Sequence, residues 1–175
     1  MDGDLRRKNI IRMISHQRKP VSASLMAKKL NVSRQVIVGD VALLRAQGHE
    51  IIATARGYII PNFNEMNQYL GKVACQHTGK NTKNELYAIV DLGAVVVNVI
   101  VEHEFYGELT GCLNLVTRDD VDAFIEKVEA SKVKLLSELS VKGAHLHTVA
   151  CRNIAHFEEV CQALEAGGYL YLHRD

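Results

Sequence analysis

The first sixty residues carry apolar side chains at helical spacing, interrupted at short intervals by turn-forming residues. This spacing predicts three helices, over residues 5–16, over 22–30 and from 34 to about 47. Asp4, Ser22 or Ser24, and Ser33 stand where helix N-caps are expected, and Asn31 stands where a left-handed stop is expected. The positions predicted to face the core are Leu5, Ile10, Ile11, Ile14, Leu25, Met26, Leu30, Val36, Ile37, Val41, Leu43 and Leu44.

Two short β-branched runs follow these helices, at residues 50–53 and 57–60, on either side of a turn that contains Gly57. They predict a short hairpin. Three helices with a tight turn between the second and the third, followed by a hairpin, form the winged helix-turn-helix pattern. We therefore predict a winged helix-turn-helix domain over residues 1–61.

The segment from Ala27 to Ile37 resembles the helix-turn-helix of bacterial repressors. A small side chain at Ala27 allows two helices to cross closely, and Ser33 opens the recognition helix. Arg34 suits guanine edges or phosphate, and Gln35 suits adenine edges. The residues predicted to contact DNA are Ser33, Arg34, Gln35, Thr54 and Arg56. The alternative is a winged fold used for protein contacts, with Arg34 in solvent.

The pattern after residue 61 mixes strands and helices. A linker and a helix with the stripe Met66, Tyr69, Leu70 and Val73 are predicted over residues 61–76. The remaining expected elements are a hairpin of residues 86–90 with 94–101, a strand at 109–115, a helix at 118–131, a strand from His145 to Cys151, a helix at 155–166 and a strand at 169–172. This order predicts an α+β domain with a mainly antiparallel sheet over residues 62–175.

Charge separates the two parts of the chain. Residues 1–60 hold 11 Lys and Arg against 4 Asp and Glu, whereas the rest holds 10 against 16. A basic first third on an acidic body suggests a polyanion partner for the first part only. Solvated charge is the alternative interpretation.

The apolar runs and the cysteines of the chain indicate the compartment in which the protein works. The longest apolar run, residues 94–101, is interrupted by Asn98 and is much shorter than the roughly 20 residues that a bilayer needs. The first residues show no apolar secretory segment. The four cysteines form no Cys-x-x-Cys pair, so we expect free thiols in a reducing cytoplasm and no membrane partner.

Two histidines one residue apart, His145 and His147, lie in the strand predicted after Gly143. Side chains alternate along a strand, so both imidazoles face the same side and can reach one point, which suits a metal ion. Further ligand candidates are His77, His103, His156, His173 and the carboxylates, with His77 and Glu85 on either side of a polar stretch. Three histidines and one carboxylate suit a divalent transition metal such as Ni, Zn, Fe or Mn. A His pair that is only solvated or hydrogen-bonded is the alternative.

The second part of the chain resembles the three-histidine (3H) domain. The matching stretches are Cys75-Gln76-His77, the following Glu85, residues 105–109, residues 136–139 and Gly143-Ala144-His145-Leu146-His147-Thr148. Together with the helix-turn-helix, the chain resembles nicotinate-responsive repressors of NAD biosynthesis and niacin uptake. This resemblance implies that His77, Glu85, His145 and His147 bind the metal.

The resemblance also implies a homodimer that binds a double-stranded DNA operator, with nicotinate as effector. A pyridine nitrogen can fill an open metal position, and the carboxylate suits a cation or backbone donors. Phe105, Tyr106 and Arg118 are the predicted effector contacts, and Lys80, Lys83 and Arg152 are further candidate cations. Two alternatives stay open: a regulator for which the metal itself is the signal, and a metal-dependent enzyme that acts on a pyridine.

Overall fold

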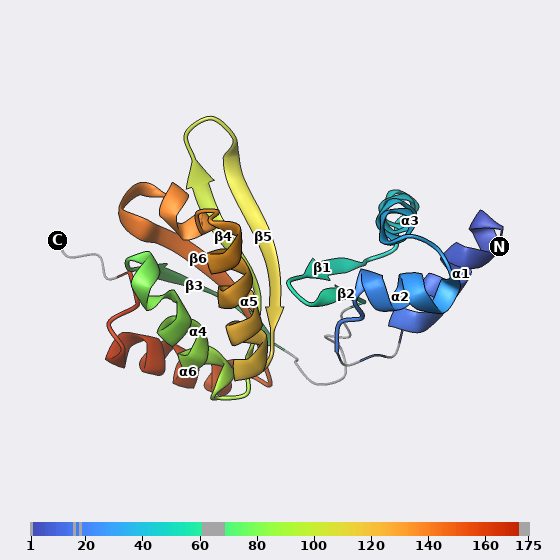
Figure 1. The fold of residues 1–175 in the computed structure, drawn as a ribbon. Helices are drawn as coiled ribbons and strands as arrows, with labels where there is room; N and C mark the ends of the chain where they lie inside the picture. Colours follow the sequence, from blue (N-terminus) through green and yellow to red (C-terminus); the bar gives the residue numbers. More distant parts are fainter. Residues whose placement is uncertain (1, 16, 18, 61–68, 172–175) are drawn as a thin grey trace. The chain divides into compact units, whose positions relative to one another are not determined.

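The computed structural model describes residues 2–15, 17, 19–60 and 69–171 (Figure 1). It divides the chain into two compact units, Met1–Asn62 and Phe63–Asp175. Each unit has its own apolar core. None of the helices in the described part of the chain is long and apolar enough to cross a membrane.

The first unit is a helix-turn-helix with a short β-hairpin. The hydroxyl groups of Ser22 and Ser33 accept hydrogen bonds from the backbone N–H groups of Leu25 and Val36, which caps the second and third helices. Asn31 has a φ of 53° and ends the second helix in the left-handed conformation. The predicted helix-turn-helix is thus confirmed. The elements are α1 (Gly3–Ile14), α2 (Ala23–Leu30), α3 (Arg34–Ala46), β1 (Ile52–Thr54) and β2 (Gly57–Ile59).

Several residues predicted to face this core lie at the surface instead. Leu25, Val36 and Leu43 are 45%, 37% and 52% exposed, and Leu5 is exposed as well. The core prediction for these four residues is wrong, because each helix buries only one stripe of side chains. Met26 lies in the buried stripe of α2, and Ile37 and Leu44 lie in that of α3. Helix α1 begins at Gly3, before the predicted cap Asp4, and the Asp4 carboxylate pairs with Arg7.

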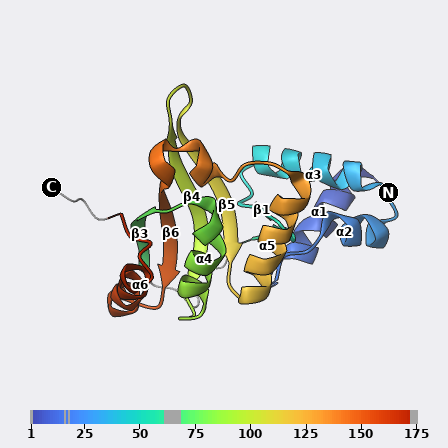
Figure 2. The same ribbon diagram turned by 60° about the vertical axis from the view of Figure 1, so that its left-hand side comes forward.

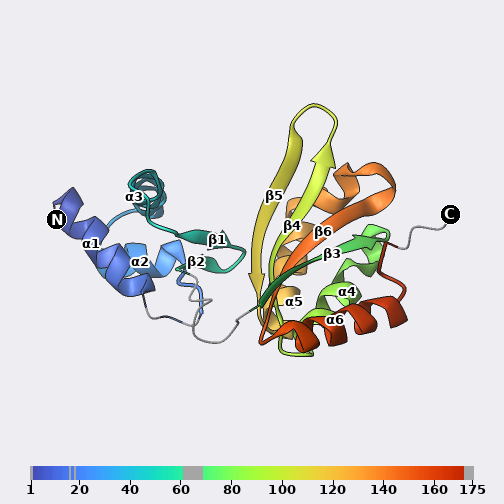
Figure 3. The ribbon, with the colours of Figure 1, turned by 180° about the vertical axis from the view of Figure 1, so that it is seen from behind.

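The second unit is a four-stranded antiparallel sheet with helices packed on one face. Figure 2 shows the strand order β3-β6-β4-β5 across the unit. Helices α4 and α5 lie in front of the strands in Figure 1 and behind them in Figure 3, and α6 packs against β3 and β6. The α+β prediction is confirmed. The elements are β3 (Tyr69–Gln76), α4 (Thr82–Val90), β4 (Val95–His103), β5 (Gly107–Leu115), α5 (Arg118–Ser131), β6 (Ala144–Cys151), α6 (Ile154–Ala166) and the 3₁₀ turns Gly79–Asn81, Leu136–Leu139 and Val141–Gly143.

Two segments differ in type from the prediction: one predicted helix is a strand, and one predicted strand is a helix. The stripe assigned to a helix before residue 76 is strand β3, in which Gly71, Val73 and Cys75 are buried on alternate positions; Met66 and the linker lie outside the described residues. The run 86–90, predicted as a strand, belongs to helix α4, which buries Leu86, Ile89 and Val90. Short apolar runs fit both periods, and the packing of the whole unit decides between them. In the predicted closing strand, Leu170 forms a single bridge with Cys75, and Leu172 lies outside the described residues.

Candidate metal centre and DNA-binding surface

Glu85 is a fully buried carboxylate on α4 that faces three imidazoles. Its Oε2 lies 2.7 Å from His77 Nε2, and its Oε1 lies 3.2 Å from His145 Nε2 and 3.5 Å from His147 Nε2. The structure therefore brings together all four of the residues that were predicted as metal ligands. Helix α4 supplies the carboxylate, whereas the sequence pattern placed Glu85 just before a strand.

Strand pairing holds the three histidines on one side of the sheet. His145 and His147 occupy alternate positions of β6, and His77 follows the end of the neighbouring strand β3. Gly143 precedes β6 with a φ of 74°, and a Cβ at this position would collide with the carbonyl oxygen of His77. A glycine here lets the two segments approach, which keeps His77 beside the His145–His147 pair.

Each imidazole has its Nδ1 atom 2.8 Å from a backbone carbonyl oxygen: Thr78 for His77, Gly143 for His145 and Asn98 for His147. A carbonyl oxygen only accepts, so each Nδ1 carries a proton and donates it. In a neutral imidazole the Nε2 atom then has a lone pair that can bind a metal ion, whereas in a protonated ring Nε2 donates a hydrogen bond to a carboxylate such as Glu85. Metal-bound histidines are commonly oriented by such a hydrogen bond from the other ring nitrogen.

The protonation of this cluster depends on burial and on the surrounding rings. Burial acts to raise the pKa of Glu85, but hydrogen bonds with His145 and His77, together with the nearby His147 ring, outweigh it and hold that pKa well below its ordinary value. Burial acts to lower the pKa of His77, but the Glu85 carboxylate outweighs it and the pKa is raised. The Glu85 carboxylate thus stays ionised and favours the protonated form of His77.

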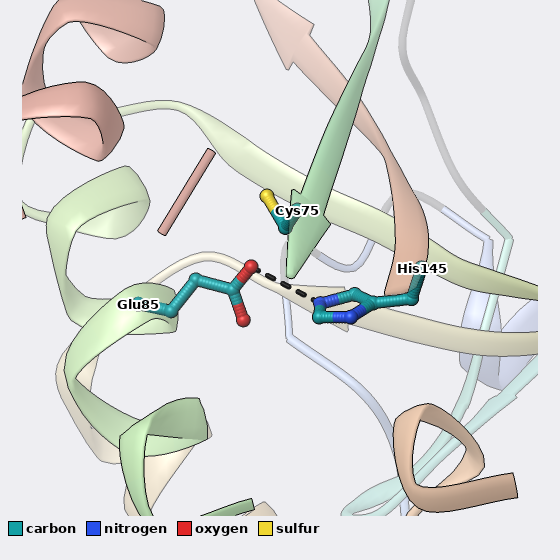
Figure 4. A group of neighbouring side chains, drawn as sticks. All are labelled: Cys75, Glu85 and His145. Atoms are coloured by element: carbon teal, nitrogen blue, oxygen red, sulfur yellow. Dashed lines mark hydrogen bonds and ion pairs between the residues drawn. The ribbon is translucent and has the colours of Figure 1, made fainter. Parts of the chain in front are cut away.

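Cys75 places a sulfur atom at this site, and the metal prediction did not include that residue. A ligand atom from Cys75, one from Glu85 and one from His145 lie within 4.8 Å of one another (Figure 4). The thiol is fully buried, and desolvation followed by the charge of Glu85 raises the pKa of Cys75 far above its ordinary value. The sequence carried a signal for it, because Cys75 precedes His77 by two residues, and side chains two positions apart in an extended segment project to the same side.

An apolar cavity of about 230 Å³ opens beside Glu85, His145 and His147. Two buried side-chain atoms that make no hydrogen bond among the described residues, His147 Nε2 and Thr82 Oγ1, belong to residues in its wall. Lys134 is the one lysine or arginine in the wall, and sequence reasoning missed it. The other lining residues are Leu86, Val99, Gly111, Cys112, Leu113, Phe124, Val128, Leu135, Leu136 and Ser137.

The predicted effector contacts lie elsewhere in the unit. Phe105 and Tyr106 are 82% and 76% exposed in the turn between β4 and β5, where their rings flank His103. Arg118 forms an ion pair with Asp91 and stacks on the Tyr87 ring. None of these three residues, nor Lys80, Lys83 or Arg152, is among the residues that line the cavity.

Two of the remaining histidine candidates are also separate from the cluster. His156 is buried on α6, with Nε2 2.9 Å from the carbonyl oxygen of Leu92. His103 ends β4 beside the two aromatic rings, and His173 lies outside the described residues.

The predicted DNA contacts divide into exposed side chains and turn-forming ones. Arg34 and Gln35 are exposed at the start of α3, and Arg56 is exposed in the turn between β1 and β2. Ser33 caps α3 with its hydroxyl, and the Thr54 hydroxyl donates to the carbonyl oxygen of Gly57 while it accepts from the N–H of Arg56. Ser33 and Thr54 therefore shape the segments that carry the arginines.

Part of the basic excess of the first unit is used inside it. Asp40 on α3 is 4% exposed, and its carboxylate pairs with Arg6 and Arg7 of α1. A buried carboxylate requires such partners, because a lone ion would be costly to desolvate. These pairs link α1 to α3.

Family models match both units: an HTH domain over residues 6–59 and a 3H domain over residues 71–173. The chain belongs to the 3H-domain family. Among its curated relatives, Transcription repressor NadR of Bacillus subtilis is 38% identical over 170 residues, covering 96% of this chain and 94% of the relative. Probable transcription repressor NiaR of Thermotoga maritima is 38% identical over 165 residues, covering 94% and 93%. The predicted family is confirmed, and these repressor names indicate a regulator rather than an enzyme.

Proposed function

We propose that this 3H-domain protein is a DNA-binding transcription repressor of NAD-related genes, and that nicotinate bound beside a divalent metal ion sets its affinity for the operator. The observation that carries the proposal is the convergence of three imidazole Nε2 atoms on the buried Glu85 carboxylate, next to an apolar cavity. The full-length similarity to two proteins named as transcription repressors supports the DNA-binding part.

The donor set fits a divalent transition metal. Neutral imidazole nitrogens and a carboxylate are ligands that Zn, Ni, Fe and Mn accept. Among the residues that the structure describes, His147 Nε2 has no hydrogen-bond partner, which is costly for a buried nitrogen unless an ion completes its environment. A bound ion would balance the charge of Glu85 and offer a coordination position to a pyridine nitrogen.

The cavity fits an aromatic acid. Its apolar wall, including Phe124, suits a pyridine ring, and Lys134 offers the cation that a carboxylate requires. Thr82 Oγ1 is a further polar group without a hydrogen-bond partner in the described structure. We assign the carboxylate contact to Lys134 in place of Arg118, which Asp91 already neutralises.

Metal analysis tests the ion. Purified wild-type protein should hold about one divalent ion per chain, and His147→Ala should lose it. The matched control is His103→Ala, which replaces a histidine outside the cluster. Equal metal content in the wild type and in His147→Ala would refute the site.

An electrophoretic mobility shift assay on promoters of niacin and NAD genes tests the effector. Nicotinate should change operator affinity by about 5- to 150-fold, the usual range of allosteric coupling. Lys134→Met should weaken the response to nicotinate, and Lys80→Met should not. A response to metal alone, unchanged by any pyridine, would identify the ion as the signal.

A further inference from the structure

Cys75 lies within the proposed metal centre, although it does not belong to the three-histidine set. Cys75 on β3 is the direct partner of His145 on the neighbouring strand β6. Directly paired residues of neighbouring strands project to the same face of a sheet. Figure 4 shows the Cys75 side chain beside the Glu85 carboxylate and the His145 ring. The donor atoms of these three residues lie within 4.8 Å of one another, close enough to share one ion.

The other buried cysteine of the same sheet face provides a contrast. Cys151 lies on β6 with the same parity as His145 and His147 and is also fully buried. It is four residues beyond His147, which is about 13 Å along a strand. Cys151 pairs with Tyr69 and packs in the apolar core, as a structural cysteine does. Cys75, in contrast, has its sulfur beside the Glu85 carboxylate.

A second feature of the same cluster points to an ion. His147 is 3% exposed, and its Nε2 faces Glu85 without a hydrogen bond among the described groups. Cys75, Glu85 and His145 thus bring a sulfur, an oxygen and a nitrogen atom together, and the Nε2 atoms of His77 and His147 face the same carboxylate.

We propose that Cys75 is a fifth donor to the metal centre and that its sulfur makes the site selective for thiophilic borderline ions. This inference rests on the proposed metal site. As the metal–sulfur bond forms, the thiol proton passes to solvent. Thiolate favours ions such as Zn, Co and Ni over Mn and Mg, which prefer oxygen ligands. Cys75 thereby sets which ion the repressor carries.

Cobalt substitution tests the sulfur bond directly. Full-length protein is stripped with a chelator, loaded with one Co(II) per chain and scanned in the near ultraviolet. We expect a sulfur-to-cobalt charge-transfer band in the wild type, which Cys75→Ser and Cys75→Ala abolish. Cys151→Ser controls for a buried cysteine, and Cys112→Ser controls for the cysteine that lines the cavity; both should keep the band.

X-ray absorption spectroscopy of the zinc-loaded wild-type protein tests for the metal–sulfur bond without a substitution. A sulfur shell near 2.3 Å, beside nitrogen and oxygen at about 2.0–2.1 Å, supports the inference. Competition between Zn and Mn should show that the preference for Zn falls at least about tenfold in Cys75→Ser.

The possible failures are distinguishable. A wild type that binds Co(II) through the histidines, with binding lost in His147→Ala but with no charge-transfer band, overturns the role of Cys75 and leaves the metal site intact. A band that persists in Cys75→Ser also overturns it. A wild type that binds no metal overturns both the metal site and the sulfur donor.

Discussion

Glu85 and His77 form a buried pair whose charges depend on each other. The pKa of Glu85 is lowered, so its contribution to stability is present above the ordinary glutamate value of about 4.3 and is lost as the pH falls through the lowered value. The pKa of His77 is raised, so its contribution is fully present below the ordinary imidazole value of about 6.5 and is lost as the pH rises through the raised value.

We therefore expect metal-free protein to have its highest melting temperature between these limits. The melting temperature should fall toward alkaline pH as His77 loses its proton beside a buried carboxylate. Glu85→Gln should flatten this alkaline decline, whereas the exposed carboxylate variant Glu165→Gln should keep it. Thermal melts of chelator-treated protein across pH provide the measurement, and a flat wild-type profile would contradict the coupling.

Arg34 is an exposed side chain at the first position of the recognition helix α3. If it reads a guanine edge or a phosphate, Arg34→Ala should weaken operator binding by about tenfold to a hundredfold. Fluorescence anisotropy with a labelled operator measures the change. Arg118→Ala, which breaks a surface ion pair with Asp91, is the control and should leave operator affinity unaltered. Metal content should stay at the wild-type level in both variants.

At the scale of the elements, the start of β6 joins the metal ligands to the backbone. Gly143 and Gly168 both have a φ of 74°, but only at Gly143 would a Cβ meet another chain segment. Gly168→Ala should lower the free energy of unfolding by roughly 1 kcal/mol through backbone strain. Gly143→Ala adds overpacking against His77 and should lower it by about 2–4 kcal/mol.

The two glycine variants should differ more in metal affinity than in the free energy of unfolding. Gly143→Ala should shift His77 away from His145 and weaken metal affinity by at least about tenfold. Gly168→Ala should keep wild-type affinity. Denaturant unfolding and metal titration on both variants give the two readouts. Equal metal affinities would show that the approach of Gly143 to His77 is not required by the site.

The elements also differ in how well their sequences predict them. Helix α3 has a serine cap, a preceding left-handed Asn31 and a regular buried stripe, all within a few residues. Helix α4 spans only nine residues, and its start is poorly marked in the sequence, since Asn81 at its N-cap makes no side-chain cap hydrogen bond. Its apolar run suits a strand equally well until the sheet offers a face for Leu86 and Ile89.

For the whole molecule, the proposed repressor links two functions that the chain carries in separate units. Linkage requires that operator DNA and nicotinate change each other's affinity by the same factor. If nicotinate tightens operator binding tenfold, saturating operator should tighten nicotinate binding tenfold. Calorimetry of nicotinate with and without an operator duplex measures this, and a nicotinate affinity that is the same with and without operator would contradict the coupling.

Local sequence was sufficient for the helix-turn-helix, for the shared face of His145 and His147, and for the α+β class. Caps, turns and side-chain alternation depend on residues a few positions apart. The convergence of the site depended on the tertiary structure, because Glu85 is 60 positions from His145 and reaches it only when α4 packs on the sheet. Packing also brought Cys75 to the carboxylate, made a cavity with Lys134 in its wall, and left Phe105, Tyr106 and Arg118 away from it.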